Sequence, residues 1–242
     1  MHGRLDLPDL HPFYRLFDDA ALVSISDAQR RPMPPVNWLG TIHHGLPVDL
    51  FAFNGRPEGY LAFLGRISPE KRPDQAIAIA AKAGVPLKIA AKIDAVDRDY
   101  WNTTIAPLVR DAKDVEFVGE IGDDEKGAFL GGAMALLFPI DWPEPFGLVM
   151  IEAMACGTPV IAFPHGSVSE VVEDGATGCL CRTVGEAAEA VPRAAGLDRR
   201  AIRVRFEERF TAKRMAQDYV ALYRRLSLQA QPPPAALRGT GS

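Results

Sequence analysis

Short runs of apolar residues alternate along the chain with longer segments in which apolar positions recur every three or four residues. The short runs are typical of buried strands and the periodic segments of helices. Their alternation predicts a parallel sheet with helices packed against it. The predicted strands cover residues 60–65, 87–91, 115–118, 133–138, 159–162 and 178–181. The predicted helices cover residues 73–83, 100–112, 123–131, 147–155, 168–173, 186–195 and 199–228.

This order of elements indicates an α/β fold: a doubly wound, Rossmann-like parallel sheet of about six strands within residues 58–228. The first fifty residues differ, with two more predicted strands at 21–25 and 40–43. Because so few elements cannot build a complete layer, residues 1–50 are either the remnant of another domain or an extension of the main sheet. Residues 229–242, which are rich in proline and glycine, are expected to form a disordered tail.

Composition narrows the classes of function. Of the 242 residues, 48% are hydrophobic, which excludes an intrinsically disordered chain. The 27 Lys and Arg residues against 31 Asp and Glu residues give a net charge of −4, so no basic excess favours nucleic-acid binding. No apolar run reaches the ~18 residues of a membrane span, and the N-terminus does not resemble a signal peptide. We therefore expect a cytoplasmic protein with at most peripheral membrane contact.

The three cysteines are too few for a disulfide framework. Cys179 and Cys181 share one face of a predicted strand, but no further ligands are spaced to complete a metal site with them. All three, including Cys156, are interpreted as reduced packing residues. No metal site is expected.

Candidate chemistry begins after the first strand of the main sheet, because parallel sheets bind ligands beyond the carboxyl ends of their strands. Gly65 and Arg66 stand there, and Lys71 follows five residues later. A glycine lets the backbone approach a ligand, and two cations on one loop suit an anion such as a diphosphate. The alternative is a pair of solvated surface cations. No Gly-x-Gly-x-x-Gly motif follows any strand, which argues against a dinucleotide cofactor.

A second candidate is the loop at residues 142–147, which leads into the predicted helix 147–155. Glu144 in the loop and Glu152 on the helix can reach two ends of one polyhydroxylated ligand. The free N–H groups of residues 146–148, with the helix dipole, can hold a phosphate between them. Glu152 lies in an apolar stretch where an unpaired charge is costly, and the hydroxyl groups of a ribose would satisfy it. The alternative is a carboxylate that caps local backbone or pairs with a lysine.

These motifs resemble those of a known enzyme family. The chain has Glu-Pro-Phe-Gly from Glu144, Glu-Ala-Met-Ala-Cys-Gly-Thr-Pro-Val from Glu152, and Gly-Ser-Val-Ser-Glu-Val-Val-Glu-Asp-Gly-Ala-Thr-Gly from Gly166. These stretches are similar to the donor-binding, C-terminal half of the retaining GT-B glycosyltransferases of the "glycosyl transferases group 1" kind. Gly-Arg-Ile-Ser-Pro-Glu-Lys from Gly65 resembles the phosphate loop of the same family. The resemblance extends over residues 60–225.

The chain departs from the family pattern at two positions. Pro145 stands where the family usually has glycine or serine, a tolerated variation. Ser169 stands where the family usually has the proline that precedes Glu170, and this change is expected to shift that loop slightly. Trp142 is interpreted as a loop and packing aromatic rather than as a platform for a sugar.

The resemblance implies a role for each candidate residue. Arg66 and Lys71 would bind the donor diphosphate and stabilise the charge that forms on it, and Glu144 would contact hydroxyl groups of the transferred sugar. These three are the expected catalytic residues. Glu152 would hold the ribose hydroxyls. The other expected donor-binding positions are Gly65, the main chain of Ile121, Lys126 beside the base, and the amides of Phe146, Gly147 and Leu148 along the phosphate and sugar.

The same resemblance offers an interpretation of residues 1–50. Thr-Ile-His-His-Gly from Thr41 resembles the hinge strand that joins the acceptor half to the donor half, which implies that most of the acceptor domain is absent. His2 and the glycine after it resemble a segment whose histidine approaches the donor sugar, but a frayed His2 is the preferred interpretation. His43 and His44 point to opposite faces of a strand and so form no metal pair.

We therefore expect the donor-binding domain of a retaining, hexosyltransferase-like glycosyltransferase that is incomplete alone. Its substrate would be a nucleotide sugar, UDP- or GDP-linked, with no cofactor or metal required. The acceptor is unknown, and the expected partner is an acceptor domain supplied in trans. Two alternatives stay open. One is a non-catalytic nucleotide-sugar-binding module or subunit completed by a separate acceptor domain, and the other is a related GT-B enzyme such as an epimerase or a phosphorylase.

Overall fold

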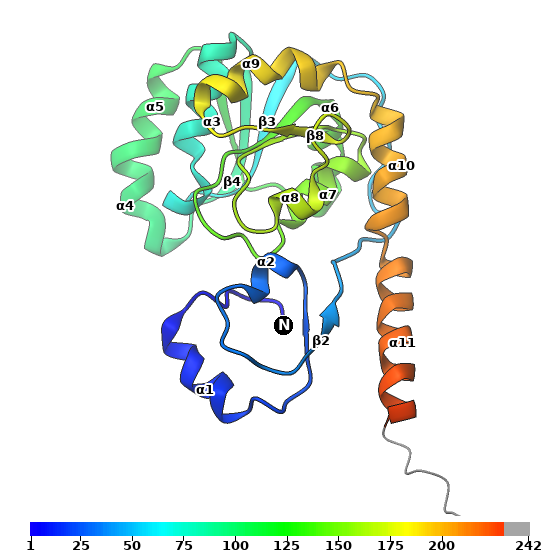
Figure 1. Ribbon diagram of the computed structural model, residues 1–242. Helices are drawn as coiled ribbons and strands as arrows, with labels where there is room; N and C mark the ends of the chain where they lie inside the picture. The colour runs from blue at the N-terminus through cyan, green and yellow to red at the C-terminus, as the bar shows by residue number, and fades with distance from the viewer. Residues whose placement is uncertain (230–242) are drawn as a thin grey trace, which may run out of the picture.

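The computed structural model describes residues 1–229. Figure 1 shows an α/β domain and, below it, a smaller part formed by the start of the chain, which we call the N-terminal unit (residues 1–44). Helix α11 (Ala212–Gln229) leaves the α/β domain and runs beside the N-terminal unit. The disordered tail predicted over residues 229–242 falls outside the described residues apart from its first position.

One parallel sheet forms the centre of the α/β domain. Its strands lie in the order β5-β4-β3-β6-β7-β8, and every neighbouring pair is parallel. Their bounds are β3 (Tyr60–Arg66), β4 (Leu87–Lys92), β5 (Val115–Gly119), β6 (Ala133–Phe138), β7 (Val160–Ala162) and β8 (Gly178–Leu180). The predicted six-stranded α/β fold is confirmed. The strand order reverses between β3 and β6, so a ligand crevice is expected where these two strands end.

Helices cover both faces of the sheet (Figure 1). On β6, Leu137 joins the buried cluster under α3 and α9, whereas Leu136 and Phe138 join the cluster under α7 and α10. Because both faces are buried, the strands are almost continuously apolar in sequence. The helices are α3 (Pro73–Ala83), α4 (Arg98–Tyr100), α5 (Ala106–Asp111), α6 (Asp123–Gly132), α7 (Leu148–Ala155), α8 (Val168–Val171), α9 (Val184–Ala195) and α10 (Arg199–Arg209), with a π-helical turn at Trp101–Ile105 and 3₁₀ turns at Pro69–Lys71 (η2) and Ala95–Asp97.

The helix predicted over residues 199–228 is divided in the structure. Phe210, between α10 and α11, is fully buried and leaves the helical conformation with φ −130°. The N–H of Leu46 donates to the carbonyl of Phe210 at 2.9 Å, and the carbonyl of Leu46 accepts from the N–H of Ala212 at 2.8 Å. The prediction of one unbroken helix is therefore wrong. A segment far away in the sequence forms hydrogen bonds with the backbone at the break.

The N-terminal unit contains a separate sheet. Its strands, β1 (Leu22–Ser24) and β2 (Trp38–Thr41), pair in parallel with each other and with no strand of the main sheet. Of the two interpretations of residues 1–50, an extension of the main sheet is therefore wrong. The other elements of this unit are the 3₁₀ turn Pro8–Leu10, α1 (His11–Leu16) and α2 (Asp27–Arg30).

Two further features bear on the sequence predictions. Cys156, Cys179 and Cys181 are all buried and free of disulfide bonds. Within residues 1–229, no helix combines the length and the apolar content needed to cross a membrane.

Candidate functional site

The first part of the site lies where β3 ends. A Cβ atom built on Gly65 would meet no other atom within 4 Å, so the backbone there faces open space. The Arg66 guanidinium lies 3.8 Å from a carboxylate oxygen of Glu70 and 3.5 Å from one of Asp94, and its side chain is 47% exposed. Ion pairs this long and this exposed are weak. The guanidinium of Arg66 is therefore available to an incoming anion.

The second part is the β6–α7 loop (residues 142–147). Gly147 ends it with φ +77°, in the left-handed region, and a Cβ atom there would lie 2.7 Å from Cε of Met150. Gly166, at φ +60°, lies against the loop so closely that a Cβ atom would come within 2.3 Å of the backbone N and O of Glu144. Both positions require glycine. Together they allow the loop to pack tightly before α7 begins.

Three consecutive carbonyl groups of the β6–α7 loop are held by serines. Ser167 donates its backbone N–H to the carbonyl of Glu144 at 2.9 Å and its hydroxyl to the carbonyl of Phe146 at 2.9 Å. Between these two, the hydroxyl of Ser26 in the N-terminal unit donates to the carbonyl of Pro145 at 2.6 Å. The loop is thus fixed by contacts from two separate parts of the chain.

The N–H groups at the start of α7 are free to bind a ligand. Those of Phe146, Gly147 and Leu148 donate to no acceptor among residues 1–229. Such groups at a helix N-terminus, with the positive end of the helix dipole, attract anions.

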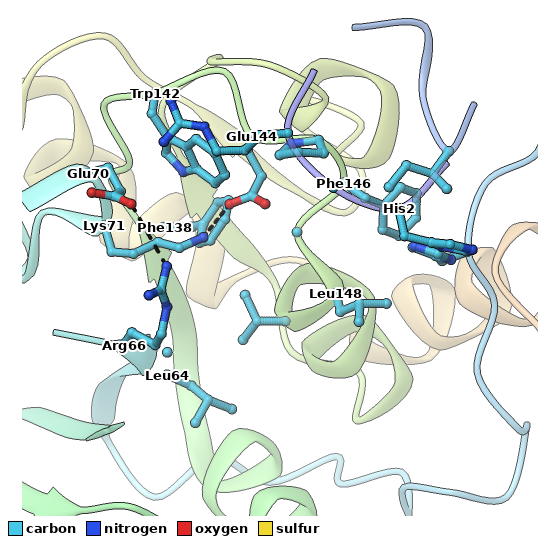
Figure 2. Close-up of a pocket in the computed structure, with 18 of the residues that line it drawn as sticks. His2, Leu64, Arg66, Glu70, Lys71, Phe138, Trp142, Glu144, Phe146 and Leu148 are labelled. Carbon is cyan, nitrogen blue, oxygen red and sulfur yellow. Dashed lines mark hydrogen bonds and ion pairs between the residues drawn. The ribbon is translucent and has the colours of Figure 1, made fainter. Parts of the chain in front are cut away.

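Lys71 and Glu144 meet inside the site. Their side chains are 17% and 9% exposed and form a hydrogen-bonded ion pair. The Lys71 ammonium also lies 5.0 Å from the ring centre of Trp142 and 5.5 Å from that of Phe138, in reach of cation–π attraction. Figure 2 shows this group, with the Arg66–Glu70 contact beside it. Since Glu144 neutralises Lys71 in the ligand-free protein, Arg66 is the more available of the two predicted cations.

Glu152 lies on α7 with its side chain 14% exposed. Lys126 stands 3.8 Å from its carboxylate but only 2.7 Å from that of Asp123. Burial raises the pKa of Glu152, and the positive charge of Lys126 opposes this only in part. The alternative interpretation, pairing with a lysine, is met only in part, because the 3.8 Å contact leaves the Glu152 carboxylate incompletely compensated.

These residues line two adjoining clefts. The larger has a volume of about 460 Å³ and the smaller about 240 Å³. Leu64, Gly65 and Val149 line both, so the clefts form one crevice between β3 and α7. The larger cleft contains Gly65, Arg66, Lys71, Glu144, Phe146, Gly147 and Leu148. The smaller contains Gly65, Ile121, Lys126 and Glu152. Every predicted site residue therefore lies along this crevice.

Sequence reasoning missed part of the lining of the larger cleft. Trp142, interpreted as a packing aromatic, forms a wall of it with Lys71 against its ring. The Arg4 guanidinium lies 4.9 Å from the centre of the same ring. A tryptophan inside the Glu144 loop was the available signal for this wall. No local pattern pointed to Arg4, which belongs to the N-terminal unit and lines the larger cleft.

The interpretation of His2 as a frayed residue is wrong. Its ring stacks on that of His44, with centres 5.2 Å apart and planes 9° from parallel, and both rings line the larger cleft. The His44 ring meets Phe146 edge-on at 5.0 Å. Burial, followed by the nearby charge of His2, lowers the pKa of His44. The neutral form of His44 is therefore favoured near neutral pH.

The fold matches that of GT-B glycosyltransferase structures. A family model described as "Glycosyl transferases group 1" matches residues 52–196, which include all of the predicted site residues. The chain belongs to this family.

Among curated proteins, the chain is similar to D-inositol 3-phosphate glycosyltransferase of Mycobacterium tuberculosis. The two are 34% identical over 158 residues, which cover 61% of this chain and 30% of the relative. The matched stretch thus covers less than a third of that protein's length.

Solved structures of the same fold were also found. AviGT4, a glycosyltransferase involved in avilamycin A biosynthesis, matches with a TM-score of 0.74 and 25% identity over 86% of this chain and 64% of its own. Sucrose-phosphate synthase from Thermosynechococcus elongatus matches with a TM-score of 0.76 and 25% identity over 90% of this chain and 61% of its own. Anabaena HepE in complex with UDP and glucose, at 19% identity and a TM-score of 0.75 over 90% of this chain and 67% of its own, shows the shared fold alone.

Proposed function

We propose that the chain binds the nucleotide-diphospho-sugar donor of a retaining glycosyl transfer. One observation supports this most directly: Arg66 and the free N–H groups at the start of α7 line a single cleft. That cleft continues into the one that holds the buried carboxylate of Glu152. The crevice thus has an anion-binding part with hydrogen-bonding groups on either side of it. This arrangement fits a diphosphate that carries a sugar at each end.

The proposed donor lies along the crevice with its base, ribose, diphosphate and transferred sugar in that order. The base occupies the smaller cleft beside the main chain of Ile121 and Lys126, and the ribose hydroxyls donate to Glu152. The diphosphate lies between Arg66 and the α7 N-terminus. The transferred sugar, a hexose, fills the larger cleft, where its hydroxyls reach Glu144.

The reaction we propose places negative charge on the leaving diphosphate while the sugar passes through an oxocarbenium-like state. Arg66 and the N–H groups of residues 146–148 stabilise that charge as it forms. A diphosphate beside Lys71 would share the ammonium with Glu144, so Lys71 contributes mainly once the charge develops. With these groups in place we propose no metal or other cofactor. The acceptor hydroxyl attacks the anomeric carbon from the side of the leaving group as the bond to the diphosphate breaks, which retains the anomeric configuration, and its proton passes to the departing diphosphate oxygen.

Acceptor binding belongs to a different part of such an enzyme. Because the matched stretch covers only 30% of D-inositol 3-phosphate glycosyltransferase, we propose that efficient transfer needs further polypeptide that supplies the acceptor site.

Titration calorimetry with UDP, GDP and ADP tests the donor proposal. At least one of them is expected to bind, and Arg66→Ala and Glu152→Ala are each expected to weaken that binding by about tenfold or more, the usual effect of losing a charged hydrogen bond. The effect of Arg66→Ala should be larger at low salt, because its partner is an anion.

Arg110→Ala is the matched control for Arg66→Ala. Its side chain is 74% exposed and pairs only with Asp111 among the described residues, so the nucleotide affinity should not change. The proposal is rejected if none of the three nucleotides binds at concentrations up to millimolar. It is also rejected if neither Arg66→Ala nor Glu152→Ala alters the affinity.

A further inference from the structure

We propose that Ser26 and Glu170 are positioning residues for the β6–α7 loop. Through them the N-terminal unit helps to build the phosphate- and sugar-binding end of the crevice, rather than only the side that faces an acceptor. The binding part of this inference rests on the proposed function, but the contacts that carry it do not.

Glu170 joins α8 of the α/β domain to α2 of the N-terminal unit. Its carboxylate accepts the N–H of Asp27 at 2.8 Å and that of Ala28 at 2.7 Å. These N–H groups belong to the first turn of α2, where no helical acceptor exists, so a carboxylate is a favourable partner. Nε2 of His43 lies 3.3 Å from the same carboxylate. Burial alone would raise the pKa of Glu170, but the hydrogen bonds from His43, Asp27 and Ala28 hold it below its usual value.

Ser26 carries this docking to the β6–α7 loop. It is fully buried, immediately precedes the two residues that Glu170 holds, and donates its hydroxyl to the carbonyl of Pro145 at 2.6 Å. The same hydroxyl oxygen accepts the N–H of Gln29 at 2.9 Å. A hydroxyl used both as donor and as acceptor has a fixed orientation. Because Ser26 directly precedes the two residues that Glu170 holds, the position of its hydroxyl against Pro145 depends on Glu170.

The Pro145 carbonyl matters because a peptide unit is planar and trans. Its oxygen and the N–H of Phe146 belong to one such unit and point in opposite directions. Holding the carbonyl on Ser26 therefore aims the Phe146 N–H away from Ser26, and Phe146 itself lines the larger cleft. In the next unit, Ser167 holds the Phe146 carbonyl and so aims the N–H of Gly147 in the same manner. Only the first of these two depends on the N-terminal unit.

Amide hydrogen exchange on the ligand-free protein tests the positioning directly. Ser26→Ala is expected to speed exchange of the hydrogen-bonded N–H groups in and on the loop, those of Glu144, Met150 and Ser167, by about tenfold, because a buried hydrogen bond that holds the loop is lost. Ser24→Ala is the matched control. Ser24 is equally buried in the same unit, but its hydroxyl bonds to Thr41 at 2.8 Å and makes no hydrogen bond to the loop. Equal exchange of the loop in both variants would overturn the inference.

A binding measurement separates positioning from general destabilisation. The probe is the tightest of UDP, GDP and ADP, compared with its own nucleoside. Ser26→Ala and Glu170→Gln should each weaken the diphosphate roughly five- to tenfold. The nucleoside, which occupies only the smaller cleft, should keep its affinity. Since both residues act through one contact, the double variant should lose little more than either single one.

Glu173→Gln controls for the loss of a nearby carboxylate, because Glu173 pairs with Arg205 and Arg209 instead of with α2. Its diphosphate affinity should equal that of the unmodified protein. If that protein binds the nucleotide and neither Ser26→Ala nor Glu170→Gln changes the ratio of diphosphate to nucleoside affinity, the inference fails while the proposed function stands. If no nucleotide binds at all, the proposed function fails and the exchange experiment alone decides the inference.

Discussion

The negative charge on Glu152 destabilises the fold in the absence of a ligand. Burial raises the pKa of its carboxyl group, and Lys126 is too distant to cancel the effect. A group whose pKa is raised by folding stabilises the fold below its unfolded pKa, and this contribution is lost as the pH rises through its folded pKa. Ionised Glu152 therefore weakens the ligand-free fold at neutral pH. Hydroxyl groups that donate to it would remove that cost.

Glu152→Gln is expected to raise the free energy of unfolding of the ligand-free protein at about pH 7. A typical substitution instead lowers that free energy by ~1 kcal/mol. At about pH 3.5, where both side chains are neutral, the difference should vanish. Urea denaturation at the two pH values measures it. Glu189→Gln, at an exposed position on α9, should show no change at either pH. A less stable Glu152→Gln variant at neutral pH would contradict this account.

The sequence predicted a set of residues that the structure brings together along the crevice, but not which of them form ion pairs across it. Gly65, Arg66 and Lys71 stand within one short stretch of sequence, as do Glu144 and the residues up to Leu148, so each group was recognisable locally. The ion pair between Lys71 and Glu144 joins those two groups across the crevice. Such a contact depends on where β3 and β6 lie in the sheet, and no sequence spacing contains that information.

Two elements that are adjacent only in the folded sheet create the crevice. The strand order reverses between β3 and β6, which opens a gap beyond their carboxyl ends. The turn after β3 and the loop before α7 fill opposite sides of that gap. Gly65 lies where the two clefts meet, with nothing packed against the position of its missing side chain.

Gly65→Ala should therefore separate binding from stability. Its methyl group would enter open space, so the free energy of unfolding should stay within about 0.5 kcal/mol of the original value. The same methyl group would stand where the backbone is proposed to approach the diphosphate, so nucleotide affinity should fall by roughly tenfold. Calorimetry and urea denaturation on one preparation measure both quantities.

Gly40→Ala provides the comparison. Gly40 lies on β2, also faces open space, and lines neither cleft. Both its stability and its nucleotide affinity should be unchanged. A Gly65→Ala variant that binds nucleotide normally would mean that the backbone at Gly65 does not closely approach the ligand.

The predicted helices and strands are accurate where the signals that determine them lie in the local sequence. β6 at 133–138 and α3 at 73–83 were predicted with the bounds that the structure shows, because continuous apolar runs and a glycine after the helix are local signals. The division between α10 and α11 was not predicted; the backbone at the break pairs with Leu46, which lies in a distant segment of the sequence. The separate β1–β2 sheet was left open, because the apolar pattern of a strand does not identify its partner.

For the molecule as a whole, arginines late in the chain bind backbone carbonyls of much earlier segments. Arg214 donates to the carbonyls of His43 and His44 at 2.8 and 3.0 Å, and Arg225 donates to that of Leu39 at 2.7 Å. These bonds attach α11 to the N-terminal unit, along which it runs in Figure 1. Hydrophobic periodicity describes only the apolar face of a helix. It therefore predicted that these residues are helical without indicating what their polar side chains hold.

Arg199 makes the most buried of these attachments. Its guanidinium is within hydrogen-bond distance of four acceptors: the carbonyls of Asn54 (2.7 Å), Ala133 (2.9 Å) and Gly131 (2.8 Å) and the hydroxyl of Thr158 (2.7 Å). These bonds tie α10 to the segments that precede β3, β6 and β7. Burial lowers the pKa of Arg199, and none of its hydrogen-bond acceptors among residues 1–229 is a carboxylate.

Arg199→Leu is expected to lower the free energy of unfolding by about 3 kcal/mol or more, because it leaves several buried acceptors without a donor. Arg200→Leu, at the exposed neighbouring position, should change it by less than about 0.5 kcal/mol. Arg199 lies at the end of the sheet where strands begin, and the crevice lies where they end. Nucleotide affinity of the folded Arg199→Leu protein, measured below its unfolding temperature, should therefore equal that of the original chain. A stability loss below about 1 kcal/mol would mean that water replaces the guanidinium. A fall in affinity as large as that of Arg66→Ala would mean that the two ends of the sheet are coupled.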